Sequence, residues 1–217
     1  MTTLTITETV AAVLALMVAI IGHEIMHGYV AYRYGDTTAK NEGRLSINPL
    51  VHIDLVGTII VPAVLYFSGA PFMFGWAKPV PIYLQRVIQG GGYKAAMHVS
   101  LAGIAYNFTL AFLAAALIGM FDDLRDINNI FEYFFVYFLF QTLIYNTVLG
   151  IFNLYPIPPL DGSHALTYFA IMQRWYGLAR MFESLERYGM IILILIIATP
   201  LSHYVFLPIR YVLSLLY

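Results

Sequence analysis

An H-E-x-x-H pattern lies within Ile21-Gly22-His23-Glu24-Ile25-Met26-His27-Gly28, inside an apolar, helix-forming run. Residues four positions apart share one face of a helix, so His23 and His27 would present their imidazole rings side by side. Two imidazoles at this spacing suit one Zn²⁺ ion, and Glu24 would reach the water that such an ion binds. The alternative is a pair of hydrogen-bonded histidines without a metal. The cost of ionisable groups in an apolar helix favours the metal site, with Glu24 as a general base.

The composition around this motif is that of an integral membrane protein. Of the 217 residues, 60% are hydrophobic and 11% are charged, whereas soluble domains contain about 25% charged residues. Runs without Lys, Arg, Asp or Glu occur at 55–77, 95–121, 133–160 and 188–209, and about 20 apolar residues suffice to cross a bilayer. The chain has no cysteine, which excludes thiolate metal sites. Its net charge of −1 argues against a nucleic-acid partner.

These runs predict an all-α integral membrane protein in which residues 1–217 form one polytopic domain. Helices are expected at about 6–34, 95–121 and 131–155, which form a three-helix core, and at about 188–207, which forms a C-terminal transmembrane helix. Residues 208–217 would form a short tail. The polar, turn-rich segment 36–49 contains short β-prone pieces, so we expect either a small β-hairpin at the membrane surface or a plain connector.

Positive charges predict the orientation, because Lys and Arg mark the cytoplasmic side. They cluster after the first helix, after the run at 55–77 and after Asp161: Arg33, Lys40, Arg44, Lys78, Arg86, Lys94, Arg174, Arg180 and Arg187. The simplest layout puts the N-terminus outside, and the H-E-x-x-H motif and Asp161 in the cytoplasmic half of the membrane. Residues of about 50–78 then begin and end on the same side, which predicts a re-entrant or broken hairpin at their Gly and Pro residues. An ordinary spanning helix is the alternative there.

A catalytic zinc needs about three protein ligands, so a residue distant from the first helix must supply the third. Asp161 is the best candidate, because it follows a proline-broken run and precedes Gly162, which permits a tight turn. A carboxylate in an apolar segment is costly unless a cation compensates it. The other candidates are His164, His52, Asp54 and Asp36. Capping of the following helix is the alternative role for Asp161.

The H-E-x-x-H motif and the run Asn153-Leu-Tyr-Pro-Ile-Pro-Pro-Leu-Asp161-Gly162 together resemble the site-2 protease family of intramembrane zinc metalloproteases. The runs Gly43-Arg-Leu-Ser-Ile-Asn-Pro49 and Gly75-Trp-Ala-Lys-Pro-Val-Pro81 are similar to those of a compact bacterial subgroup without an inserted PDZ module. The resemblance implies a catalytic core with one Zn²⁺ per chain, held by the two histidines and Asp161. The family's middle helix usually carries G-P-x-x-N, whereas this chain has Gly103-Ile-Ala-Tyr-Asn107. Because of this departure, two roles stay open for Asn107: a hydrogen bond near the site, or ordinary hydrogen bonding between helices.

The resemblance predicts a zinc-dependent endopeptidase that cuts peptide bonds within or near transmembrane segments, as in regulated intramembrane proteolysis. Asn153 is our first choice, and Asn107 our second, for the side-chain amide that stabilises the oxyanion and positions the substrate. The implied substrate is a single-pass membrane protein, such as an anti-sigma factor or a peptide remnant. The implied location is the bacterial cytoplasmic (inner) membrane, with the lipid bilayer as partner. The segment 36–49 would pair with an unwound substrate as an added strand.

Two other functions compete with this prediction. The same histidines and Asp161 would serve a small metal-ion transporter or channel. A non-enzymatic membrane scaffold would need none of them. The enzyme is favoured because Glu24 within H-E-x-x-H has a natural role only in hydrolysis, and because the sequence contains no visible internal repeat of the kind that many transporters have.

Overall fold

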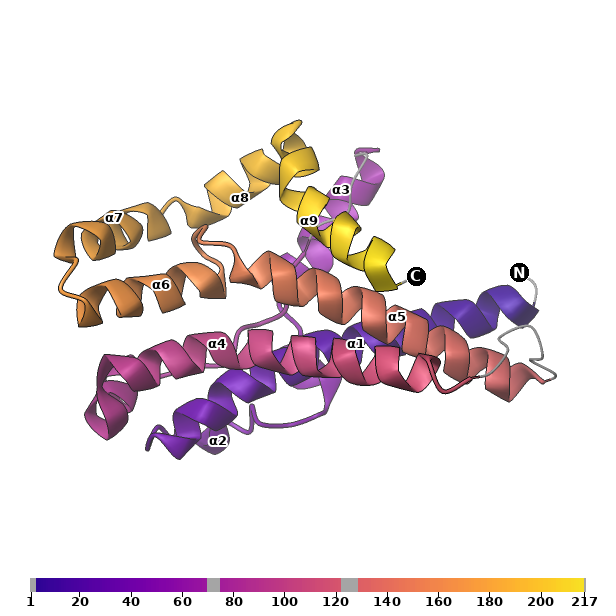
Figure 1. Cartoon of the computed structure of the whole chain (residues 1–217), viewed down its shortest axis with the longest axis horizontal. Helices are drawn as coiled ribbons and strands as arrows, with labels where there is room; N and C mark the ends of the chain where they lie inside the picture. The colour runs from indigo at the N-terminus through magenta and orange to yellow at the C-terminus, as the bar shows by residue number, and fades with distance from the viewer. Residues whose placement is uncertain (1–2, 70–74, 122–128, 217) are drawn as a thin grey trace.

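The computed structural model describes residues 3–69, 75–121 and 129–216. Most of these residues are helical, and none of them is assigned to a strand. Three helices lie along the long axis of the molecule and contact one another: α1 (Thr3–Arg33), α4 (Leu84–Ile118) and α5 (Ile130–Leu154) (Figure 1). Among the described residues, these three helices are each long and apolar enough to cross a membrane by themselves. The predicted all-α membrane architecture is therefore confirmed at this level.

The bundle is held together by small residues. Ala11, Ala15 and Ala19 are four positions apart on α1, and all three are completely buried. Lipid tails are as apolar as the helices, so helices in a membrane associate mainly through close packing, which small side chains permit. Gly22 continues this stripe, since a Cβ there would lie 2.1 Å from the ring of Tyr106 on α4. Larger apolar residues of α1, such as Val10 and Leu14, are exposed on its outer face.

The predicted β-hairpin at 36–49 is wrong. The segment contains α2 (Thr38–Asn41), a single helical turn, followed by turns. Asp36 explains the difference, because its Oδ1 accepts the N–H and hydroxyl hydrogens of Thr38 and thereby turns the chain. Such local bonds from a side chain to the backbone compete with strand pairing. Segment 36–49 therefore offers no strand for a substrate to pair with.

The region between α2 and α4 leaves the bundle and returns to it. It contains η1 (Pro49–His52, a 3-10 turn), η2 (Leu55–Ile60, a π-helical turn) and α3 (Val61–Phe67). The apolar helix 55–67 is shorter than the roughly 20 residues that span a bilayer. The extended chain after Gly75 then runs back along its start, since Trp76 N–H donates to the Gly57 carbonyl at 3.1 Å and Lys78 N–H to the His52 carbonyl at 2.9 Å. Residues 70–74 lie outside the described residues, so the re-entrant or broken hairpin at about 50–78 stays a prediction.

The C-terminal part is more broken than the sequence predicted. It contains α6 (Asp161–Met172), α7 (Tyr176–Glu186), α8 (Gly189–Ala198) and α9 (Leu201–Leu216). The single helix expected at 188–207 is instead α8 and α9, bent by 81° at Thr199 and Pro200. Proline has no N–H to continue α8 and holds the preceding residue extended. The expected tail at 208–217 belongs to α9 through Leu216, with Pro208 inside the helix.

α4 differs from its predicted bounds for a related reason. It begins at Leu84 rather than at 95, and Gly91 and Gly92 interrupt its helical geometry. Gly92 has a φ of +67°, which a residue with a side chain rarely adopts. The helix before this kink passes close to the end of α1, since a Cβ at Gly90 would lie 1.9 Å from the carbonyl oxygen of Tyr34. The straight part of α4 corresponds to the predicted helix.

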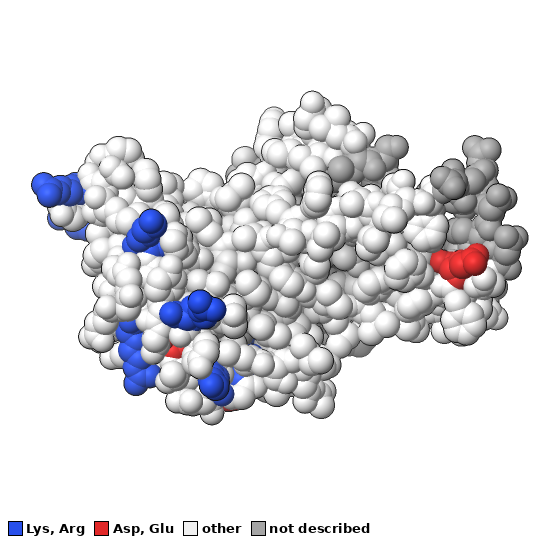
Figure 2. All heavy atoms as spheres, turned by 60° about the horizontal axis from the view of Figure 1, so that its bottom comes forward, with Lys and Arg blue, Asp and Glu red and all other residues white. Residues whose placement is uncertain are grey.

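Basic residues are unevenly distributed along the long axis. Figure 2 shows Lys and Arg gathered toward the end of the molecule that carries α2, α7 and the start of α4, with a few acidic atoms among them, whereas the coloured atoms at the opposite end are acidic. The sequence of α1 follows the same trend, with Glu8 near its beginning and Arg33 at its end. This asymmetry is the structural counterpart of the charge pattern used above to predict orientation.

Asp36 ties the end of α1 to the start of α4. It is 1% exposed, and its Oδ2 accepts the N–H of Tyr83 at 2.6 Å. Burial alone would raise the pKa of the Asp36 carboxyl, but hydrogen bonds from Thr38 and Tyr83 and the charge of Arg86 hold that pKa below its ordinary value of 3.8. The carboxylate therefore stabilises the folded state fully above pH 3.8, and this contribution is lost as the pH falls through the lower folded pKa.

Asp36→Asn is expected to lower the free energy of unfolding at pH 7 by about 1–3 kcal/mol, because the amide has a single acceptor oxygen and its NH2 group faces a donor that the carboxylate accepted. The measurement is thermal unfolding in detergent as a function of pH, in which the two proteins should converge below pH 3.8. Glu42→Gln, at an exposed carboxylate of the same segment, is the control and should change little. Equal stability of wild type and Asp36→Asn at pH 7 would contradict this role.

Candidate metal centre

Two helices bring together the residues of the predicted metal site. His23 and His27 lie on one face of α1, and Asp161 is the first residue of α6. The Oδ2 atom of Asp161 is 3.1 Å from Nε2 of His23 and 3.2 Å from Nε2 of His27, and the two Nε2 atoms are 3.0 Å apart. Within the described ranges, this is the one group of three or more His, Cys, Asp or Glu side chains arranged to hold a metal.

Asp161 reaches the histidines because a short turn connects α5 to α6. α5 ends at Leu154, and the proline-rich turn 155–160 leads directly into α6. The two helices approach so closely there that a Cβ at Gly162 would lie 2.2 Å from the Leu154 carbonyl oxygen. Any residue larger than glycine would push the start of α6, and with it Asp161, away from α1.

Hydrogen bonds orient both imidazole rings. Nδ1 of His23 lies 2.7 Å from Oδ1 of Asn107, and Nδ1 of His27 lies 2.7 Å from the carbonyl oxygen of Val99. Both partners are acceptors, so each Nδ1 carries the proton and each Nε2 presents a lone pair. This is the usual arrangement of metal-binding histidines, whose second nitrogen donates to a carbonyl or carboxylate oxygen.

The donor set fits a zinc ion. Two Nε2 lone pairs converge on Oδ2 of Asp161, which is buried and accepts no hydrogen bond. Three such electron-rich atoms repel one another unless a cation lies between them. A tetrahedral zinc with bonds of about 2.0–2.2 Å places its ligand atoms about 3.3–3.5 Å apart. The observed separations of 3.0–3.2 Å are within a few tenths of an ångström of that spacing.

α4 closes the cluster on a third side. A Cβ at Gly103 would lie 2.5 Å from atoms of both the His23 and the His27 rings, so no larger residue fits there. We did not predict Gly103 or the Val99 carbonyl as site groups. The spacing Gly103-x-x-x-Asn107, about one helical turn, is the signal that would have identified Gly103, because it puts the glycine on the face of Asn107. A backbone carbonyl has no such signal.

Glu24 lines a cavity of about 670 Å³ together with both histidines and Asp161. The walls are formed by α1, the extended chain after Gly75, α4, the end of α5, α6 and α8. One carboxylate oxygen of Glu24, Oε2, accepts the N–H of Val80 at 2.9 Å. A carboxylate held through one oxygen beside metal ligands is suited to exchange protons with a water molecule in the cavity.

The two asparagines predicted to position substrate differ in their surroundings. Asn153 lines the cavity, and its Nδ2 donates to the Leu149 carbonyl at 3.1 Å. Asn107 is completely buried, and its Nδ2 donates to Ala19 O at 3.2 Å and to Asn146 Oδ1 at 2.8 Å. Asn107 does not line the cavity, and its Nδ2 already donates to two acceptors inside the bundle. Its Oδ1 orients His23 instead.

The other candidates for the third ligand are engaged elsewhere. Nε2 of His52 bonds to the Ser46 carbonyl at 2.8 Å, and Asp54 caps η2 through the Gly57 N–H at 2.6 Å. Asp36 holds Thr38 and Tyr83, as described above. His164 lies one helical turn beyond Asp161, with its Nε2 3.4 Å from Oε1 of Glu186. The structure thus brings Asp161 alone of the five candidates to the histidine pair.

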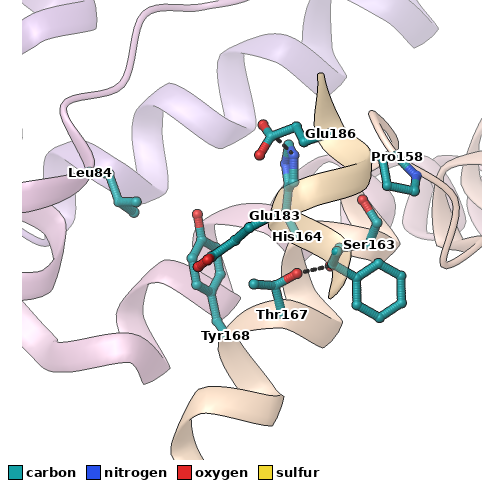
Figure 3. A pocket seen from close by; sticks show the side chains of 9 residues that line it. Leu84, Pro158, Ser163, His164, Thr167, Tyr168, Glu183 and Glu186 are labelled. Carbon is teal, nitrogen blue, oxygen red and sulfur yellow. Dashed lines mark hydrogen bonds and ion pairs between the residues drawn. The ribbon is translucent and has the colours of Figure 1, made fainter. Parts of the chain in front are cut away.

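A second, smaller pocket adjoins this cavity between α6 and α7. Figure 3 shows Glu186 against the His164 ring and Glu183 next to Tyr168. His164 and Tyr168 also line the larger cavity, so the two spaces share a wall. Burial, followed by the negative charges of Glu186 and Glu183, raises the pKa of Tyr168 to about 12. Tyr168 therefore keeps its proton at neutral pH.

Comparisons with known proteins agree with this chemistry. The family model described as Peptidase family M50 matches residues 115–197. The chain is 35% identical over 202 residues to the Bacillus subtilis (strain 168) protein named "Putative zinc metalloprotease YwhC", covering 90% of this chain and 84% of that protein. It is 30% identical over 178 residues to "Putative zinc metalloprotease Rip2" of Mycolicibacterium smegmatis (strain ATCC 700084 / mc(2)155), covering 82% of this chain and 62% of that protein. No solved structure matches the chain.

Proposed function

Because this chain belongs to peptidase family M50, the site-2 protease family of zinc metallopeptidases, we propose that it hydrolyses peptide bonds within or beside transmembrane segments of membrane proteins. One observation carries the proposal: His23, His27 and Asp161 converge within 3.2 Å of one another in a cavity walled partly by α1 and α4, which are long enough to cross a bilayer. A peptidase with its site between such helices would meet substrates that share the membrane. Residues 1–217 would act as a single domain.

In this proposal His23, His27 and Asp161 hold the zinc ion. The bonds from Nδ1 of each histidine support this role, since they leave both Nε2 atoms as ligands. Zinc bound there supplies a Lewis acid and lowers the pKa of its water to about 7. Asn107 supports the site indirectly, by holding the His23 ring in place.

Glu24 is the proposed general base. It accepts a proton from the water whose oxygen forms a bond to the substrate carbonyl carbon, and it returns that proton to the amide nitrogen as the C–N bond breaks. The products are a new carboxyl group and a new amino group. Asn153 is the proposed oxyanion donor, because its side chain lines the same cavity. It would exchange its 3.1 Å bond to the Leu149 carbonyl for one to the substrate.

The proposed orientation places the basic end of the molecule in the cytoplasm and the N-terminus outside. The distribution of Lys and Arg in Figure 2 supports it, since they gather at the end where α1 finishes and α7 lies. The bacterial relatives support placement in the cytoplasmic membrane. In this layout the chain at about 50–78 would be a re-entrant hairpin, which enters and leaves on the cytoplasmic side. The substrate would be a single-pass protein, such as an anti-sigma factor or a peptide remnant.

The test is cleavage in reconstituted vesicles. The purified protein and a fluorescently tagged single-pass substrate are placed in the same vesicles, and a water-soluble peptide with the same scissile sequence is the control substrate. Cleavage of the embedded substrate is expected, with loss of activity on zinc chelation or His23→Ala and recovery of the chelated wild type when zinc is restored. Cleavage of the soluble peptide alone would overturn the intramembrane proposal. Zinc flux across vesicles without cleavage would favour a transporter.

A further inference from the structure

An extended stretch of chain, residues 76–82, forms one wall of the cavity and contacts the proposed general base. Val80 N–H donates to Oε2 of Glu24 at 2.9 Å. Val80 itself is buried, and Pro79 and Pro81 on either side have no N–H to offer. The Val80 amide is therefore a donor through which this wall holds the Glu24 carboxylate.

Arg44 holds the same stretch from its other side. Its Nη2 donates to the Lys78 carbonyl at 2.8 Å and to the Pro79 carbonyl at 3.3 Å. Arg44 is 5% exposed although it lies in the loop after α2. A buried guanidinium is costly unless it is hydrogen-bonded, and the Nε of Arg44 is buried without a partner, so the two carbonyls that Nη2 reaches are the contacts that offset the burial of Arg44.

The two contacts are adjacent along the backbone. Pro79 C=O, which accepts from Arg44, and Val80 N–H, which donates to Glu24, belong to the same peptide unit. A peptide unit is planar and rigid, so fixing its oxygen also fixes the direction of its N–H. Packing adds to this, because Gly28 brings α1 so close that a Cβ there would lie 2.7 Å from Val80 Cγ1 and from Leu45 Cδ2.

We propose that Arg44 is a positioning residue for peptide hydrolysis: by gripping the Lys78 and Pro79 carbonyls it aims the Val80 N–H at Glu24 and holds that carboxylate beside the metal ligands. The inference rests on the proposed role of Glu24 as general base. In this proposal the Gly43–Pro49 and Gly75–Pro81 runs act together. The first run supplies Arg44, which holds the second run against the helix that carries H-E-x-x-H.

The first experiment is Arg44→Ala in the full-length protein, assayed for cleavage and zinc content. We expect kcat to fall about ten- to a hundredfold, because displacing a catalytic group by about an ångström costs on that order. KM should stay unchanged, and so should a zinc content of one per chain. Arg44 does not line the cavity, and its hydrogen bonds go to the Lys78 and Pro79 carbonyls rather than to the proposed zinc ligands. Arg44→Lys should recover part of the rate. Arg180→Ala is the control, since this exposed arginine also donates to a backbone carbonyl, that of Tyr176.

A double-mutant cycle separates positioning from general stability. Val80→Pro removes the N–H that Glu24 accepts while keeping an apolar side chain. If Arg44 acts through that N–H, the double variant Arg44→Ala/Val80→Pro should be no slower than the slower single variant. The proposal would be overturned if the fold-losses in kcat of the two single variants multiplied in the double variant. It would also be overturned if kcat fell only in proportion to a lower melting temperature or a lower zinc content.

Hydrogen exchange supplies a readout that needs no cleavage. Arg44→Ala is expected to speed exchange of the 76–83 peptide at least tenfold, with no change in the α1 peptides. Unchanged exchange in that peptide would overturn the proposal even if kcat fell. A rise in kcat of Arg44→Ala would also overturn the proposal, because residues 76–82 would then block access to the site rather than position Glu24. If the wild type cleaves only soluble peptides, the intramembrane proposal fails, but kcat on those peptides and the exchange rates still test Arg44.

Discussion

Glu24→Gln should abolish peptide cleavage while zinc remains bound. Glutamine has the size of glutamate and still offers an oxygen to the Val80 N–H, which Glu24 accepts at 2.9 Å. It has no basic carboxylate to take the proton of the attacking water, and general bases contribute about 10²–10⁴ in rate. The histidines and Asp161 are untouched, so the metal site should stay intact. The measurement combines kcat in vesicles with zinc content by elemental analysis.

A matched control for this variant is Glu186→Gln. Glu186 lies near the site, but its carboxylate faces His164 in the neighbouring pocket. This variant should keep zinc and most of the wild-type rate. Comparable cleavage by Glu24→Gln would show that another group is the base. Loss of zinc from Glu24→Gln would mean instead that the glutamate helps to hold the metal.

Gly103→Ala is expected to disrupt the metal centre although it adds a single methyl group. Its Cβ would lie 2.5 Å from both the His23 and the His27 rings, far inside van der Waals contact. The rings cannot retreat freely, because their Nδ1 atoms are bonded to Asn107 and to the Val99 carbonyl. We expect zinc affinity to fall by a factor of about 10–100, the usual effect of disturbing the support of metal ligands. Competition with a chromophoric chelator measures it.

The control for this variant is Gly177→Ala on α7. A Cβ at Gly177 meets no atom within 4 Å, so alanine fits without displacing anything. Zinc affinity should be unchanged. If Gly103→Ala binds zinc as tightly as Gly177→Ala does, α4 does not support the imidazole pair in the way described here.

Helices with long apolar runs were predicted well, because composition and period are local properties. α1 and α5 begin and end within a few residues of their predicted bounds. The errors occur where one side chain or one ring decides the backbone path. Asp36 turns the chain that was expected to form a β-hairpin, and Pro200 splits the helix that was expected at 188–207. α4 starts earlier than predicted because a helical segment precedes Gly91 and Gly92, where the backbone kinks before the straight part of the helix begins.

Residue order along the chain already implied a zinc chemistry, because His23 and His27 are four residues apart and any helix would bring their imidazoles to one face, with Glu24 beside them. Folding in three dimensions selected Asp161 over four other candidates, turned Asn107 toward His23 and aimed a backbone amide of residue 80 at Glu24. Contacts of this kind join segments that lie far apart in the chain. They depend on how closely α1, α4 and α6 approach, and a backbone N–H or C=O looks the same at every position of a sequence.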